Sequence, residues 1–166
     1  INAPLGHAAG DSVLIQMKEV LVTVFRESDY LVRWGGEEVL VVARFCQTAG
    51  APVLAERLRL LMENYEFMIP GGKTLKNTCS IGFACYPFLE EEPEVIRWTQ
   101  VSDIADHCLY AAKKTQRNAW VGLYGTGKGD HQLLFKHIVE YPEQLLLNNE
   151  IEVATSINPK SQLIWK

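Results

Sequence analysis

A glycine pair followed by two carboxylates stands between two apolar runs in Arg33-Trp34-Gly35-Gly36-Glu37-Glu38-Val39. The runs on either side, residues 30–32 and 39–42, are rich in residues that favour strands. Because Gly-Gly supplies the positive φ values of tight turns, the stretch predicts a β-hairpin with two carboxylates at its tip. Adjacent strand residues face opposite sides of a sheet, so Glu37 and Glu38 are not expected to have equal roles. Two interpretations of these carboxylates stay open: a pair that binds a metal ion, and a turn that is simply exposed to solvent.

Three further segments lie at fixed offsets from this hairpin. They are Ile1-Asn2 with Gly6-His7 and Gly10-Asp11, then Ser80-Ile81-Gly82 with Pro87, and finally Ala105-Asp106 through Leu109-Tyr110 with Ala112-Lys113 and Arg117-Asn118. In order and spacing, the four segments resemble the motifs of the GGDEF domain, the bacterial diguanylate cyclase module, here in a GGEE form. The resemblance covers residues 1–124. We expect residues 125–166 to be a linker and a C-terminal tail of unknown role.

The resemblance implies an α/β fold of the α+β sandwich type. Its central, mostly antiparallel sheet would be flanked by helices, as in nucleotidyl cyclases and polymerase palms. Apolar spacing by itself predicts helices over 11–25, 52–64 and 103–114, and strands over 78–86 and 120–124. Asp11 is a candidate N-cap of the first helix. In the tail, residues 133–139 have the spacing of a short helix and residues 151–153 that of a strand.

The activity that the resemblance implies joins two GTP molecules into cyclic di-GMP and releases pyrophosphate. A homodimer is expected, because one half-site holds one GTP. Phosphoryl transfer needs a divalent cation, Mg²⁺ or Mn²⁺, to neutralise developing charge. By motif position, Glu37 is the expected metal ligand and helps to deprotonate the attacking hydroxyl. Glu38 is the expected second or supporting ligand, so both are candidate catalytic residues.

Four residues match substrate-binding positions of the family. Lys113 and Arg117 would bind the triphosphate from one helical face if the helix continues to Arg117. Cations near a helix C-terminus are also favoured by the helix dipole alone. Asn2 and Asp11 match the positions that hydrogen-bond guanine, and a plain helix cap explains Asp11 equally well.

Residues 26–29, Arg-Glu-Ser-Asp, lie at the offset of the family's R-x-x-D inhibitory site for cyclic di-GMP. Arg26 can stack on a base or bind phosphate, and Asp29 can accept hydrogen bonds from guanine. Arg57 lies near where the family often adds a further arginine. An exposed ion pair and a solvated helix face are the alternative explanations.

The sequence also departs from the family pattern. It begins after the family's first strand, which carries an aspartate metal ligand, and Ala3, Val39 and Gln116 replace the usual Asp, Phe and Gly. Besides the cyclase, two functions therefore stay open: a catalytically inactive GGDEF domain acting as a cyclic di-GMP receptor, and a GTP-binding regulatory module. The activity of this truncated chain is a separate question from that of a longer protein.

Composition and charge narrow the classes of protein to which the chain can belong. The chain has 166 residues, 48% of them hydrophobic, and a net charge of −4, as expected for a soluble globular domain that binds neither DNA nor RNA. Its apolar runs are too short for a membrane span and no leader is visible, so we expect a cytoplasmic segment without membrane contact, such as the output domain of a larger sensory protein. The four cysteines lie far apart and are expected to be reduced.

Overall fold

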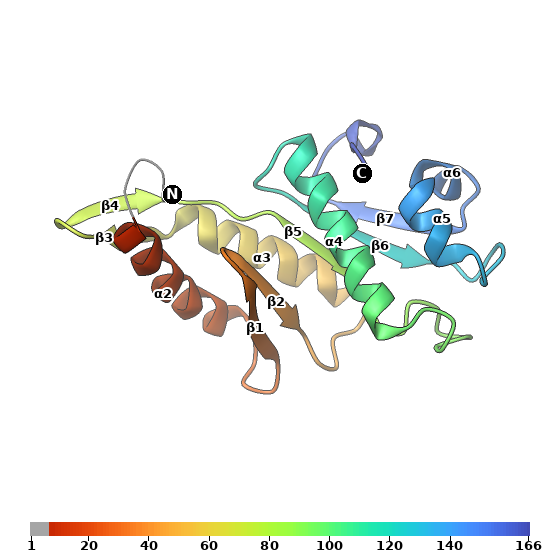
Figure 1. The fold of residues 1–166 in the computed structure, drawn as a ribbon, viewed down its shortest axis with the longest axis horizontal. Helices are drawn as coiled ribbons and strands as arrows, with labels where there is room; N and C mark the ends of the chain where they lie inside the picture. The colour runs from red at the N-terminus through yellow and green to blue at the C-terminus, as the bar shows by residue number, and fades with distance from the viewer. Residues whose placement is uncertain (1–6) are drawn as a thin grey trace. The chain divides into compact units, whose positions relative to one another are not determined.

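The computed structural model describes residues 7–166, and the chain divides into two compact units, Ile1–Thr78 and Cys79–Lys166 (Figure 1). Helices and strands alternate along both, which confirms the mixed helix-and-sheet fold. Within residues 7–166, the strands form one three-stranded and two two-stranded sheets rather than a single central sheet.

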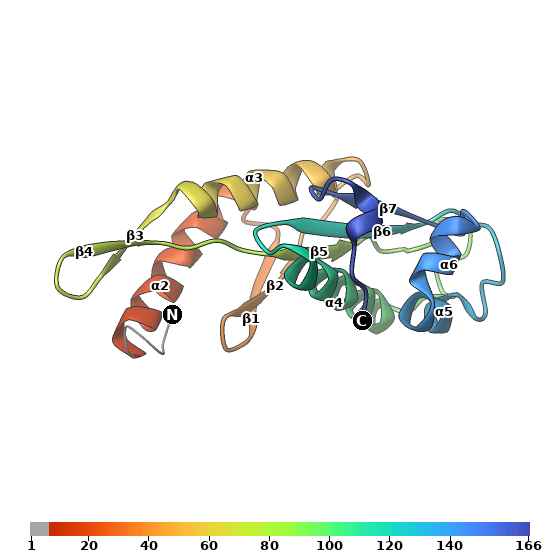
Figure 2. The same ribbon diagram turned by 90° about the horizontal axis from the view of Figure 1, so that it is seen from above.

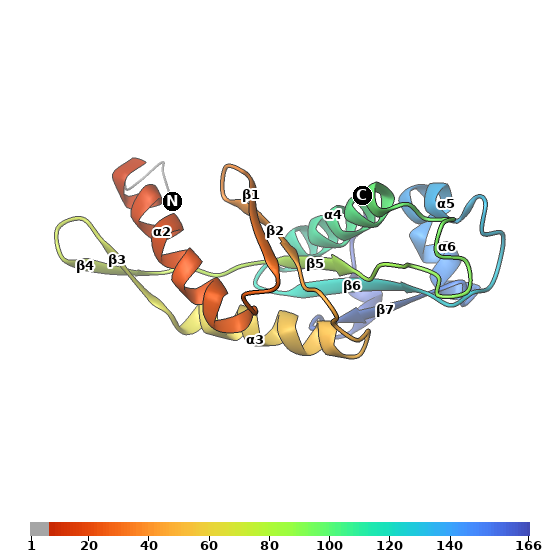
Figure 3. The same ribbon diagram turned by 90° about the horizontal axis from the view of Figure 1, so that it is seen from below.

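Over its described residues, 7–78, the N-terminal unit consists of two helices and two hairpins (Figure 3). In chain order these are α2 (His7–Val24), β1 (Tyr30–Gly35), β2 (Glu38–Val42), α3 (Gly50–Asn64), β3 (Glu66–Ile69) and β4 (Lys73–Lys76). α2 packs against α3 and β3. The buried side chains of the two helices recur at helical spacing because one face of each helix turns inward. The buried residues of this unit are Ala9, Val13, Val20, Leu21 and Val24 of α2, Ala55, Leu58 and Met62 of α3, and Phe67 of β3.

Two features of this unit differ from the sequence prediction. α2 already includes His7, so Asp11 lies inside the helix with an exposed side chain, and its prediction as an N-cap is wrong. The β3–β4 hairpin was not predicted at all. Its turn uses Gly71 and Gly72 at φ of +89° and +71°, which only glycine adopts without strain.

The C-terminal unit is a three-stranded sheet, β5 (Ile81–Ala84), β6 (Trp120–Gly125) and β7 (Ile151–Thr155), covered by α4 (Trp98–Thr115) (Figure 2). β5 runs parallel to β6, and β6 runs antiparallel to β7. Parallel strands need a long crossover, and α4 provides it. Two short helices, α5 (Leu134–Glu140) and α6 (Pro142–Leu147), and the 3₁₀ turn η1 (Lys160–Gln162) complete the unit.

Gly82 brings β5 into direct contact with the backbone of α4. A Cβ atom at this position would overlap the carbonyl oxygen of Ala105 and the amide nitrogen of Leu109, and would lie 2.7 Å from the Leu109 Cα atom. The glycine of the Ser-Ile-Gly segment is therefore required by packing. The predicted apolar stripe of α4 is confirmed, because Ile104, Cys108 and Ala111 are fully buried.

The residues after 124 share a hydrophobic core with those before it. Leu134, Ile138, Leu145 and Ile151 belong to the same buried cluster as Ile104, and β7 pairs with β6 along its length. The boundary between 124 and 125 stays a prediction, but the segment 134–157 is folded onto the sheet. In residues 7–166, no helix has the length and apolar character needed to cross a bilayer.

Candidate functional site

The β1–β2 hairpin presents its two carboxylates at an exposed tip. Gly35 pairs with Glu38, and the register shifts between Arg33 and Gly35. Gly36 forms the turn at φ +53°, and Glu37 and Glu38 are both exposed. The Arg33 guanidinium donates from Nε and Nη2 to the carbonyl oxygen of Gly36, at 3.1 and 2.9 Å. This forked contact braces the turn from one side, so the tip is held by side chain as well as by backbone.

The tip supplies two carboxylates for a divalent cation. Among residues 7–166, no group of three or more His, Cys, Asp or Glu side chains gathers into a cation site. Mg²⁺ is commonly bound through one or two carboxylates together with substrate phosphates. Glu37 and Glu38 therefore fit a cation shared with a nucleotide, and they do not form a site that would hold one alone.

The predicted inhibitory residues lie around the C-terminal end of α2. Asp29 accepts a hydrogen bond from the backbone N–H of Arg26 and another from that of Arg44, both at 2.8 Å. Its carboxylate thus ties the α2–β1 turn to the end of β2. The Arg57 guanidinium reaches across from α3 and donates to the carbonyl oxygen of Thr23 at 3.0 Å. The structure therefore brings Arg57 to the same corner as residues 26–29.

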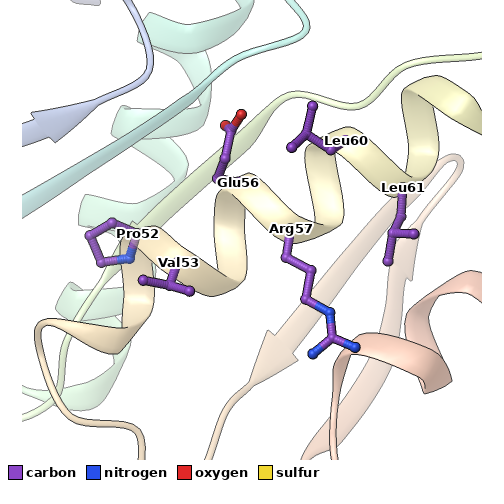
Figure 4. Close-up of a pocket in the computed structure, with 6 residues that line it drawn as sticks. All are labelled: Pro52, Val53, Glu56, Arg57, Leu60 and Leu61. Carbon is purple, nitrogen blue, oxygen red and sulfur yellow. The ribbon is translucent and has the colours of Figure 1, made fainter.

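The side chain of Arg26 is exposed at this corner. Within residues 7–166 its guanidinium makes no hydrogen bond or ion pair, so the alternative of an Arg26–Asp29 ion pair is not what the structure contains. Arg57 projects from α3, where it lines a shallow, largely apolar pocket together with Val53 and Leu60 (Figure 4).

The two cations predicted to bind phosphate do not share a helical face. α4 ends at Thr115, and Gln116 is its C-cap with φ −150°. Arg117 and Asn118 follow in the left-handed region, at φ +59° and +43°, and the Arg117 N–H donates to the Ala112 carbonyl at 2.9 Å. The condition for a shared face, that the helix continues to Arg117, is therefore not met, because this hydrogen bond closes the helix one residue after the predicted end at 114. Phosphate binding by Lys113 and Arg117 stays a prediction.

Of the two residues predicted to contact guanine, the structure describes one. Asn2 lies outside the described residues. Asp11 is an exposed residue of α2, and since it does not cap the helix, that competing explanation for its carboxylate is removed.

Comparison with known proteins identifies the family. The sequence model described as "Diguanylate cyclase, GGDEF domain" matches residues 1–119. The chain belongs to the GGDEF family. Diguanylate cyclase A of Treponema denticola is 35% identical to this GGDEF domain over 119 residues, which are 71% of this chain and 30% of the relative. Diguanylate cyclase DosC of Escherichia coli K12 is 32% identical over 118 residues, 71% of this chain and 24% of the relative.

A solved structure agrees with this assignment. The crystal structure of the GGDEF domain of PA1120 (YfiN or TpbB) from Pseudomonas aeruginosa is 32% identical, with a TM-score of 0.60, over 71% of this chain and 70% of that one. The chain spans less than a third of the length of the curated relatives described above.

Sequence reasoning missed two residues that shape the GGDEF domain's candidate sites. Arg33 braces the hairpin tip, and Arg44 provides the second backbone N–H for Asp29. The position of Arg33, three residues before the glycine whose carbonyl it binds, was the available signal. Arg44 gave none, because its contact with Asp29 joins positions 15 residues apart and uses only backbone atoms of Arg44.

Proposed function

We propose that this GGDEF domain is a diguanylate cyclase that condenses two GTP molecules into cyclic di-GMP. The single observation that carries the proposal is the exposed Glu37–Glu38 tip, braced by Arg33, in a chain of this family. A braced, solvent-facing carboxylate pair is suited to meet a metal-bound nucleotide without first reorganising.

In each condensation step, the 3′-hydroxyl oxygen of one GTP forms a bond to the α-phosphorus of the other, and pyrophosphate leaves. Glu37 accepts the hydroxyl proton, directly or through water, and shares the cation with Glu38. When bound, Mg²⁺ or Mn²⁺ supplies neutralisation of the phosphate charge. Lys113 and Arg117 bind the triphosphate. Asn2 and Asp11 bind guanine, and a homodimer places the two GTP molecules opposite each other.

Product feedback is proposed at the corner formed by Arg26, Asp29 and Arg57. The exposed Arg26 guanidinium is available to stack on guanine or to bind phosphate. Asp29 already accepts two backbone hydrogen bonds, but a carboxylate has about four acceptor positions, so capacity for guanine donors remains. Asp29 would thus both shape the turn and contact the product.

A cyclic di-GMP receptor without cyclase activity is the second candidate. The observation that favours it is the absence of a third metal-binding side chain beside Glu37 and Glu38 within residues 7–166. The receptor would use the same corner around Arg26, so the two candidates differ in turnover and agree in product binding.

The test combines a turnover assay with a binding assay on the same chain. The protein is incubated with GTP and Mg²⁺, and cyclic di-GMP and pyrophosphate are quantified by chromatography and a coupled phosphate assay. Glu37→Gln is compared with Glu27→Gln, which removes another exposed carboxylate from a turn of the same unit. In parallel, cyclic di-GMP is titrated calorimetrically into the wild type, Arg26→Ala, and Lys18→Ala as a matched exposed cation.

Product formed by the wild type and Glu27→Gln, and lost in Glu37→Gln, supports the cyclase. Micromolar binding lost only in Arg26→Ala, with no product formed, supports the receptor. If no product forms and no cyclic di-GMP binds, both proposals are overturned for this chain.

A further inference from the structure

Residues 163–166 lie along α4 and contact it at successive points; we name this segment the α4 strap. The Ile164 N–H donates to the Thr115 hydroxyl at 3.0 Å. The Lys166 ammonium is 3.9 Å from the Asp106 carboxylate and 5.7 Å from the centre of the Tyr110 ring. The strap therefore follows the helix from residue 115 back to residue 106.

A stacked pair of rings holds the middle of the strap. The Trp165 indole lies parallel to the His107 imidazole, with 5.5 Å between centroids and 12° between planes. Trp165 is 9% exposed and His107 only 3%. Trp165 and the central part of α4 belong to the same buried cluster, so the stack seals one side of the core.

His107 is a titratable group in an apolar position. Its Nε2 atom is buried and has no hydrogen-bond partner among the described residues. Burial, aided by the Lys166 ammonium, lowers the pKa of His107, while Asp106 of α4 and Glu143 of α6 act in the opposite direction. The neutral ring therefore fits the closed stack.

Protonation would add a charge to the ring and leave an N–H at the buried Nε2 atom without an acceptor among the described residues. An indole face attracts a cation, but that attraction does not satisfy the new N–H donor. Opening the stack would hydrate the imidazolium. Besides the stack, the strap is held by the Ile164 hydrogen bond, by the exposed Lys166–Asp106 ion pair and by Leu163, which packs against the core. Release therefore also exposes Leu163 and Trp165, and protonation of His107 shifts the balance towards the open strap.

We propose that the α4 strap is a pH-released clasp, closed on α4 while His107 is neutral and opened by protonation of His107. When the strap is open, His107 has the ordinary histidine pKa of about 6.5, so closure is complete above about pH 6.5. It weakens as the pH falls below that value, because the open state then binds the additional proton.

The first residues of the strap contact α4 close in sequence to the proposed phosphate-binding residues. Thr115, which accepts the Ile164 hydrogen bond, lies between Lys113 and Arg117 in the sequence. Opening would free the C-terminal end of α4, which carries Lys113 and precedes Arg117. This consequence for nucleotide binding rests on the proposed function, whereas the opening itself can be measured without any nucleotide.

The test is amide hydrogen exchange of Ile164, measured at pH 7.5 and 5.5 on the full chain and corrected for the intrinsic exchange rate. At pH 5.5, one unit below 6.5, the open state is populated about tenfold more than at pH 7.5. Protection of the Ile164 amide should therefore fall about tenfold. His107→Phe keeps an aromatic ring against Trp165 and removes the proton site, so its protection should not depend on pH. His137→Phe is the matched control, since His137 also lies beside an aromatic ring, that of Tyr141, and its removal should leave the tenfold change intact.

A second measurement does not depend on how well His107→Phe packs. The pKa of His107, followed by NMR, should rise in Trp165→Ala because the ring becomes hydrated. Ile164 protection that is independent of pH in the wild type, or equally dependent on pH in His107→Phe, would overturn the clasp. An unchanged His107 pKa in Trp165→Ala would overturn it as well.

Discussion

Replacing Gly82 with alanine tests whether β5 is fixed against the backbone of α4. The added methyl would overlap the Ala105 carbonyl oxygen and the Leu109 amide nitrogen, and it would lie 2.7 Å from the Leu109 Cα atom. Overpacking costs about 1–3 kcal/mol, and this site belongs at the upper end because backbone atoms cannot rotate away. Alanine also reduces the conformational freedom of the unfolded chain, which raises the free energy of unfolding by about 0.4–1 kcal/mol. The net expected loss of unfolding free energy is about 2–3 kcal/mol.

Urea unfolding followed by far-UV circular dichroism measures this loss, and thermal unfolding should show a Tm lower by about 5–10 °C. Two glycine variants serve as controls. Gly35→Ala adds a methyl to open space and should change stability by less than about 0.5 kcal/mol. The three atoms nearest to a methyl at Gly122 all belong to the Phe83 ring, which can rotate, so the loss in Gly122→Ala should be smaller than that in Gly82→Ala. Equal losses in Gly82→Ala and Gly35→Ala would refute the packing argument.

Further variants test single contacts. Asp29→Ala leaves two backbone N–H groups without their acceptor and should lower the free energy of unfolding by about 1–2 kcal/mol. An unchanged midpoint of urea unfolding would contradict this. Arg33→Lys removes the forked contact at the hairpin tip and should weaken calorimetric binding of Mg²⁺·GTP about fivefold with little change in Tm; unaltered affinity would argue against the brace. The hydrogen bond that His131 Nδ1 donates to the Glu92 carboxylate raises the pKa of His131, so this pair stabilises the fold below about pH 6.5 and the contribution is lost as pH rises through the raised pKa. His131→Gln should remove that pH dependence from Tm, and Tm curves of the same pH dependence in variant and wild type would refute it. Burial raises the pKa of the Cys108 thiol, so Cys108→Ala should not change the number of thiols that react in the folded protein at pH 8, as counted with a chromogenic disulfide reagent.

The elements that the sequence predicted correctly have strong local signals. The hairpin at 30–42 combines β-forming residues with Gly-Gly, and α4 has apolar residues at clear helical spacing. Such patterns report burial on one face, which the structure confirms at Val20 and Ile104. The unassigned residues 133–139 and 151–153 also formed the helix α5 and the strand β7 that their spacing favoured.

The features that the sequence did not predict depend on contacts between distant positions or on polar strands. β3 and β4 alternate too weakly to be recognised, because Glu66, Lys73 and Lys76 occupy their ends. The start of α2 was misplaced because an aspartate suits both a helix cap and the exposed face of a helix. The stack of His107 on Trp165 joins residues 58 positions apart, and nothing local to either residue indicates the other.

The R-x-x-D pattern shows how one motif can have a structural and a functional explanation at once. Asp29 accepts two backbone hydrogen bonds that fix the turn after α2, and this alone would account for an aspartate at that position. Loss of cyclic di-GMP binding in Asp29→Ala would therefore not distinguish recognition from a collapsed turn. Arg26 contributes only backbone atoms to the turn, so Arg26→Ala removes the proposed ligand contact and leaves the fold intact. An unchanged Tm together with lost binding in that variant is the result that separates a product site from a turn.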